Sequence, residues 1–185
     1  DIFSSRIFSG GALTAGGAMF GLAGLELLST QKLQLVDALS PLHAGLIISA
    51  MALSAIPTSI LGGATLHRVG FLPLISGGFL LTAAGMALVV VSRGETLPLL
   101  VSALVLTGLG AGLAMSVSST AIINAAPLHR AGMASGVEAV SYEFGTLISI
   151  ALTGTLVPLL MARELPPHLA ELGTDALHHP ASHAA

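Results

Sequence analysis

Five long runs of apolar residues follow one another along the chain, and short segments with charged residues, glycine or proline separate them. Each run is long enough for the roughly 20 residues that a helix needs to cross a bilayer. The pattern therefore predicts five transmembrane helices joined by short loops. We place them at residues 7–29, 42–66, 72–92, 97–124 and 131–161.

The composition agrees with this pattern. Hydrophobic residues make up 54% of the chain and charged residues only 8%, whereas an ordinary soluble domain has roughly 25% charged residues. The mean hydropathy is +0.92. We therefore predict an all-α membrane protein whose surroundings are the lipid bilayer. The net charge of −3 is small, and the sequence has no basic patch, so a nucleic acid partner is not expected.

Residues 163–185 differ from the rest of the chain and are predicted to form a polar, His-rich loop or tail. The segment contains Pro166-Pro167 and four of the seven histidines. His178, His179 and His183 are candidate metal ligands, but ligands on a flexible segment are poorly organised, so we expect no metal site. The absence of cysteine excludes thiol catalysis and thiolate metal sites.

No sequence signature of an enzyme is present. The spacing of Gly108, Gly110 and Gly112 resembles a glycine-rich phosphate loop, but no strand precedes it and no lysine follows it. In an apolar run these glycines are better explained as positions where neighbouring helices pack closely. With no hydrolase triad or zinc spacing either, we predict neither enzymatic activity nor a cofactor.

Three carboxylates interrupt the apolar runs: Glu26, Glu138 and Glu143. A charged group at the centre of the bilayer costs roughly 2.5–3.5 kcal/mol on insertion scales, so it usually faces a polar cavity, a proton path or a substrate. The alternative is that these residues bond to neighbouring helices or lie near the membrane interface. Their position makes them the first candidates for function.

On the fifth predicted helix, Glu138, Tyr142, Gly145 and Ser149 are spaced by four, three and four residues. This spacing places them in one narrow stripe, because an α-helix turns 100° per residue. A polar stripe on a membrane helix is expected to face the protein interior.

Two further carboxylates are expected in different surroundings. Glu143 lies about 140° around the helix from Glu138, on the side of Gly132 and Gly136, where the absence of side chains would let another helix approach. Glu26 lies near the end of the first helix, where the sequence becomes amphipathic. It is expected in a vestibule that attracts cations or, alternatively, at the hydrated interface.

The stretch from Ala134 to Gly145 resembles the penultimate helix of the fourteen-spanner drug/proton antiporters of the major facilitator superfamily. The likeness is closest to the exporters of quaternary ammonium compounds and methyl viologen. Gly24–Val36 looks like the end of their ninth helix, and Ser40–Leu46 looks like the loop that follows it. The likeness covers about residues 1–162.

A second motif lies between the second and third helices. The stretch Gly63-Ala-Thr-Leu-His-Arg68-Val-Gly70 resembles a degraded copy of the superfamily's cytoplasmic gating loop. His67 replaces the acidic residue of that loop. In some quaternary ammonium exporters a second acid follows the first glutamate of the penultimate helix, and here that position is Ala139, so its function does not carry over.

The resemblance implies a location and an orientation. Residues 1–162 would be a partial C-terminal transmembrane bundle, the ninth to thirteenth spans of a transporter in a bacterial inner membrane. The first helix would run from the cytoplasm outward, which charge alone does not indicate, since each side carries three of the six Lys and Arg residues. The remainder of the transporter would be the main protein partner.

The resemblance also implies a function. The parent protein would export lipophilic organic cations, such as quaternary ammonium, viologen or dye-like compounds, in exchange for protons. Glu138 would carry the proton, and Glu143, Glu26 and Tyr142 would support it. Two alternatives stay open: a proton-coupled transporter of sugars or metabolites in the same superfamily, and a membrane subunit or truncated remnant that transports nothing.

Overall fold

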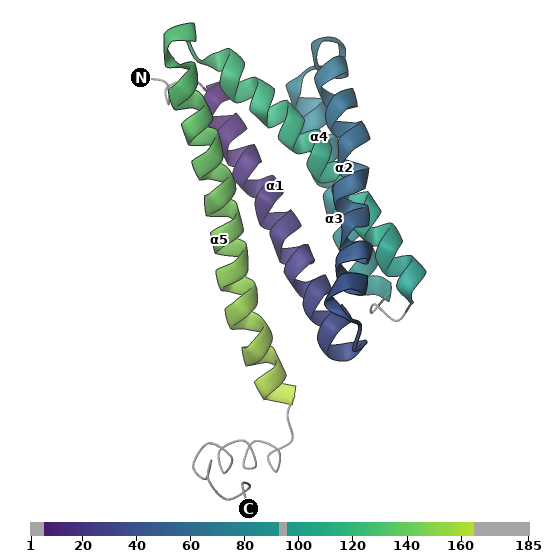
Figure 1. Cartoon of the computed structure of the whole chain (residues 1–185). Helices are drawn as coiled ribbons and strands as arrows, with labels where there is room; N and C mark the ends of the chain where they lie inside the picture. Colours follow the sequence, from purple (N-terminus) through teal and green to yellow (C-terminus); the bar gives the residue numbers. More distant parts are fainter. Residues whose placement is uncertain (1–5, 93–95, 165–185) are drawn as a thin grey trace, which may run out of the picture. The chain divides into compact units, whose positions relative to one another are not determined.

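The computed structural model describes residues 6–92 and 96–164 of the chain. Its five long helices are α1 (Arg6–Gln31), α2 (Pro41–Val69), α3 (Phe71–Ser92), α4 (Leu97–Ala125) and α5 (Ala131–Glu164). A π-helical turn, η2 (Lys32–Val36), extends α1, and a short 3-10 helix, η3 (Leu128–Arg130), precedes α5 (Figure 1). All five long helices have the length and apolar composition to cross a membrane. The predicted all-α membrane fold with five helices is confirmed.

The first helix is longer than the sequence pattern predicts and does not end at residue 29. It continues into η2, where the backbone N–H of Asp37 donates to the Lys32 carbonyl over 3.1 Å. The Lys32 ammonium also lies 2.7 Å from the Asp37 carboxylate. This ion pair lies at the end of the helix. Lys32, the only basic residue between α1 and α2, therefore already has an acidic partner.

Helix α4 is the centre of the bundle and packs against α1, α2 and α3 (Figure 1). Gly108 and Gly112 face α2, where a Cβ atom on either would collide with the backbone of Met51 or Ala55. Gly110 faces α3 instead, against Gly78. The glycines are therefore helix-packing positions, as the sequence predicted.

Interhelical hydrogen bonds reinforce the contact between α2 and α4. The Ser54 hydroxyl donates to the Val105 carbonyl over 3.0 Å, and the Ser116 hydroxyl donates to the Ser59 carbonyl over 2.7 Å. The glycines make these bonds feasible, because they let the two backbones approach closely.

The connection between α2 and α3 is a single residue, Gly70, rather than the predicted loop. Its backbone N–H donates to the Leu66 carbonyl over 2.9 Å, and its φ of 87° and ψ of 169° lie in a region that residues with a Cβ rarely adopt. Helix α2 thus extends through the whole motif from Gly63 to Val69 before the chain turns.

We expect Gly70→Ala to destabilise the fold by about 1–3 kcal/mol, since alanine would hold a strained backbone conformation there. Gly63→Ala is the matched control, because Gly63 is helical and its added Cβ would make only an ordinary contact, 3.6 Å from the Ser116 hydroxyl. Thermal unfolding in detergent, followed by circular dichroism, would compare the two. Equal stability of the two variants would contradict this account of the turn.

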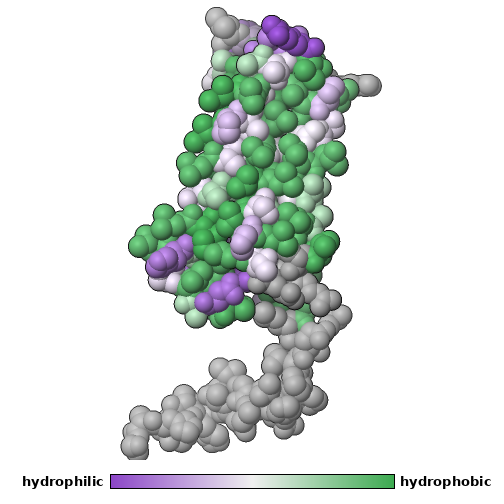
Figure 2. All heavy atoms as spheres, turned by 90° about the vertical axis from the view of Figure 1, so that its right-hand side faces the viewer, coloured by the Kyte–Doolittle hydropathy of each residue, from purple (hydrophilic) through white to green (hydrophobic). Residues whose placement is uncertain are grey.

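Contacts divide the chain into two compact units, Asp1–Ile150 and Ala151–Ala185, so the last described turns of α5 belong to the second unit. The surface is largely apolar. The face in Figure 2 is dominated by hydrophobic residues, with hydrophilic ones gathered towards its ends. Exposed leucines and isoleucines along α2, such as Leu53 and Ile60, agree with a lipid-facing or protein-facing role rather than contact with water.

Candidate functional site

The predicted stripe on α5 faces the interior of the first unit. Glu138 and Tyr142 are half-buried, and Gly145 and Ser149 are buried. The Tyr142 hydroxyl donates a hydrogen bond to Glu138 Oε1 over 2.9 Å. One helical turn separates the two residues, so the regular geometry of α5 alone brings the phenol and the carboxylate together.

Apolar side chains and one hydroxyl surround this pair. Tyr142 packs beside a buried cluster that includes Phe8 of α1, Ile122 of α4 and Ala134 of α5. Its hydroxyl also interacts with the Ser118 side chain of α4. Among the side chains that the structure describes (residues 7–91, 96–127 and 129–160), no basic one forms an ion pair with Glu138. A hydrogen bond from the Tyr142 phenol thus holds the Glu138 carboxylate, rather than an ion pair with a described side chain.

The close contact between α1 and α5 lies at Gly145 rather than where the sequence predicted it. A Cβ on Gly145 would collide with the backbone of Gly16. Gly132 and Gly136, by contrast, are exposed and have nothing within 4 Å of an added Cβ. No described helix approaches these two glycines, so their packing against a neighbouring helix stays a prediction.

Glu143 is not brought into the Glu138 site. It is exposed on α5, roughly 140° around the helix from Glu138. The two carboxylates therefore have different surroundings, as the spacing predicted. Tyr142, which donates to Glu138, packs against residues of α1 and α4, whereas Glu143 lies on a face of α5 that the described helices leave uncovered.

Glu26 is also separate from the Glu138 site. Helices α1 and α5 run in the same direction, since Phe8 packs with Ala134 and Gly16 meets Gly145. Glu138 is therefore level with about Ala12 on α1. Glu26 follows fourteen residues later, which is about 20 Å along the helix axis. It is exposed and lines a groove between α1 and α2.

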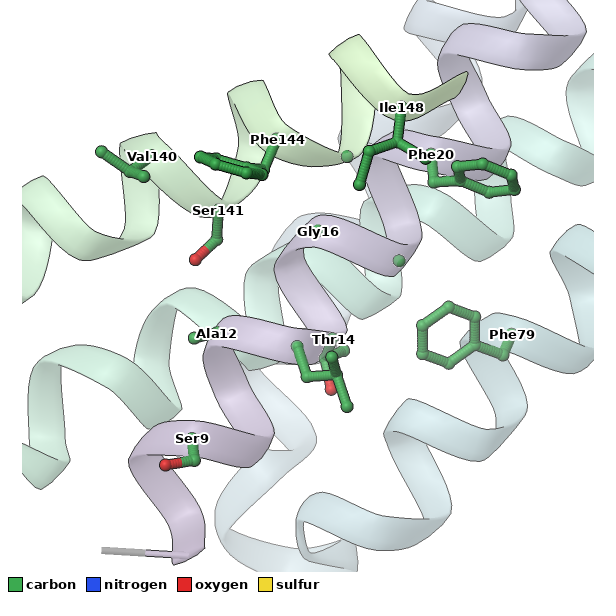
Figure 3. A pocket seen from close by; sticks show the side chains of 13 residues that line it. Ser9, Ala12, Thr14, Gly16, Phe20, Phe79, Val140, Ser141, Phe144 and Ile148 are labelled. Atoms are coloured by element: carbon green, nitrogen blue, oxygen red, sulfur yellow. The ribbon is translucent and has the colours of Figure 1, made fainter. Parts of the chain in front are cut away.

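A larger cavity, of about 720 Å³, opens between α1, α3 and α5. Phe20, Phe79 and Phe144 line it from the three helices (Figure 3). The hydroxyls of Thr14 and Ser141 at its wall donate to backbone carbonyls of their own helices. No titratable side chain lines this cavity, so it has no charged group to pair with an ionic ligand.

The residues of the predicted gating motif remain together at the end of α2. Gly63 and Arg68 are exposed in the helix, and Gly70 is the turn. Arg68 forms no ion pair with any residue that the structure describes. The described residues also hold no cluster of three metal-ligating side chains. The histidines at 178, 179 and 183 lie outside them.

Sequence reasoning missed the polar residues that line the groove together with Glu26, which are Thr30, Gln34 and Ser49. Thr30 and Gln34 follow Glu26 at intervals of four residues, so the helical period could have identified them. Ser49 lies on α2, and no pattern within one helix indicates which residue of a neighbouring helix lies opposite.

Residues 5–163 match the sequence profile of the Major Facilitator Superfamily. The methyl viologen resistance protein SmvA of Salmonella typhimurium is 33% identical over 159 residues, which cover 84% of this chain and 32% of SmvA. The multidrug resistance protein Stp of Mycobacterium tuberculosis is 30% identical over 156 residues, covering 84% of this chain and 29% of Stp.

The multidrug efflux pump LfrA of Mycolicibacterium smegmatis is 31% identical over 144 residues, covering 75% of this chain and 28% of LfrA. The chain thus spans less than a third of the length of these relatives. No solved structure matches it significantly. The sequence matches the family profile along nearly all of the described helices. This chain therefore belongs to the Major Facilitator Superfamily.

Proposed function

We propose that the native protein that contains this chain exports lipophilic organic cations in exchange for protons. The observation that carries the proposal is the Glu138–Tyr142 pair. Its carboxylate is half-buried in a helix that can span a membrane, accepts a hydrogen bond from the phenol over 2.9 Å, and has no basic partner among the described side chains. The names of the relatives, a methyl viologen resistance protein, a multidrug resistance protein and a multidrug efflux pump, favour the same cargo.

The proposed coupling needs only one carboxylate. A proton and an organic cation both neutralise Glu138, and they exclude each other there because each compensates the same negative charge. Protonation from one side of the membrane releases the cation, and deprotonation to the other side restores the binding form. Alternating access of the site to the two sides then ties cation export to proton entry.

The other predicted residues receive separate roles. Tyr142 holds the Glu138 carboxylate in one position and offers its ring face to a cation. Glu143, on the uncovered face of α5, would contact cargo or another part of the transporter. We propose that Gly63, Arg68 and Gly70 fix the short connection at the end of α2, from which Arg68 would pair with a helix C-terminus during gating.

A vesicle experiment tests this function. The native full-length protein is reconstituted into liposomes that are acidic inside and contain the pH dye pyranine, and ethidium is added outside. Ethidium should enter the liposomes while protons leave them, and each flux should require the other. Proton movement with a neutral sugar instead would favour the metabolite transporter. No response to either would favour a non-transporting subunit.

We expect Tyr142→Phe to weaken the apparent affinity for ethidium by about three- to tenfold, the size of one net hydrogen bond. Coupling to protons should persist, since the Glu138 carboxylate remains. Transport assays in the same vesicles would give the concentration for half-maximal rate. Thr146→Val is the control, because the Thr146 hydroxyl donates to the Tyr142 backbone carbonyl and not to Glu138. A similar loss in both variants would contradict a specific role for the phenol.

A further inference from the structure

The groove that contains Glu26 has the chemistry of a second ligand site. It has a volume of about 590 Å³ and lies between the C-terminal half of α1, η2 and α2. Four polar side chains line it, and apolar residues such as Leu22 and Ile48 form much of its remaining wall. A charged group at one side of an otherwise largely apolar pocket suits an amphiphilic ligand.

The polar lining of the groove is rich in hydrogen-bond acceptors. The Thr30 hydroxyl donates its hydrogen to the Glu26 carbonyl over 2.7 Å, and the Ser49 hydroxyl donates to the Leu46 carbonyl over 2.7 Å. With their hydrogens used in this way, both hydroxyls can only accept bonds from a ligand. The Glu26 carboxylate accepts as well, while the Gln34 amide can both donate and accept. The groove therefore favours a cation over an anion.

The negative charge of Glu26 has no partner in the described part of the chain. Lys32 is the nearest basic residue in the sequence, but its ammonium pairs with Asp37 at 2.7 Å. It also lies about 120° around the helix from Glu26. The ion pair between Lys32 and Asp37 thus keeps the one nearby cation away from the groove.

We infer that this groove binds a lipophilic organic ammonium ion with its charge at Glu26, at a site distinct from Glu138. The two carboxylates are about 20 Å apart along the bundle, so one such ion cannot contact both. Leu22, Ile48 and Met51 cover the apolar part of the ion. The inference rests on the proposed export of such cations and adds a second position that they occupy on their path.

Equilibrium dialysis of ethidium against the purified native full-length protein tests this inference. Wild type should bind two equivalents, and Glu26→Gln should weaken one of them by about tenfold or more, as expected for loss of a charge-assisted contact. The double variant Lys32→Gln/Asp37→Asn is the control, since it removes the ion pair at the same helix end without freeing a charge, and neither residue lines the groove. It should leave both equivalents in place.

A second variant tests the groove without changing its charge. Ala52→Phe adds a ring to the α2 wall of the groove and should exclude the same equivalent while Glu26 stays intact. The inference would be overturned if either groove variant still bound two equivalents of ethidium with unchanged affinity. It would also be overturned if wild type bound a single equivalent that only Glu138→Gln removes. No binding of ethidium to wild type would instead contradict the proposed function itself.

Discussion

Glu138→Gln is expected to reduce proton-coupled ethidium transport to the rate of protein-free membranes. The amide can still accept a hydrogen bond from Tyr142, whose hydroxyl lies 2.9 Å from Glu138 Oε1 in the wild type. It can neither bind a proton nor balance a cation, so the exchange of one for the other is lost. The variant should still enter the membrane, because a neutral amide costs less to insert than a carboxylate.

Glu138→Asp is the conservative control for this result. It keeps the charge and loses one methylene, which moves the carboxylate away from Tyr142 but leaves it able to exchange a proton for a cation. We expect slower but still coupled transport in the pyranine vesicles. Normal coupled transport by Glu138→Gln would remove Glu138 from the mechanism.

Gly110→Leu is expected to cost about 3 kcal/mol or more of stability, because it forces a side chain into a closed interface. A Cβ at this position would lie 2.5 Å from the Gly78 carbonyl oxygen and 2.5 Å from the Thr82 backbone nitrogen. Both contacts are with the backbone of α3, so the two helices would have to separate. Overpacking therefore outweighs the roughly 1 kcal/mol by which leucine exceeds glycine in helix propensity.

Gly77→Leu is the matched control for this variant. Gly77 lies on α3 directly before Gly78, and nothing is within 4 Å of an added Cβ there. The same substitution should be neutral or slightly stabilising at this site. Thermal unfolding and the yield of monodisperse protein in detergent would compare the two variants. Equal stability would contradict the close packing of α3 on α4.

The hydrophobic pattern was sufficient for the class of fold. A run of some 20 apolar residues has few stable structures in a bilayer other than a helix, since every backbone polar group must be bonded internally. That is why five helices could be predicted from their apolar runs. The match to a transporter family also confirms that the chain does not belong to a family of enzymes.

Helix ends were predicted less well, because they depend on single residues. Helix α2 extends to Val69, beyond the predicted end at residue 66, since Gly70 supplies the backbone conformation that turns the chain. The continuation of α1 into η2 depends on backbone bonds such as Asp37 to Lys32. Apolar periodicity contains no information about either contact.

Positions within one helix were predictable, but positions across helices were not. The stripe of Glu138 and Tyr142 follows directly from the period of α5, and the structure places it inward. Which glycine meets a neighbouring helix depends on how two helices cross. For this reason Gly145 packs against Gly16, while Gly136 contacts nothing nearby. The role of Glu138 itself stays a prediction.

Proton release on cation binding tests the central claim most directly. Ethidium is added to the purified full-length protein in weakly buffered detergent solution, and the change in pH is compared between wild type and Glu138→Gln at equal occupancy. If a cation and a proton compete for Glu138, wild type releases more protons per bound cation than the variant, which keeps only the carboxylate of Glu26 as a cation site. Equal proton release by the two proteins would contradict the account.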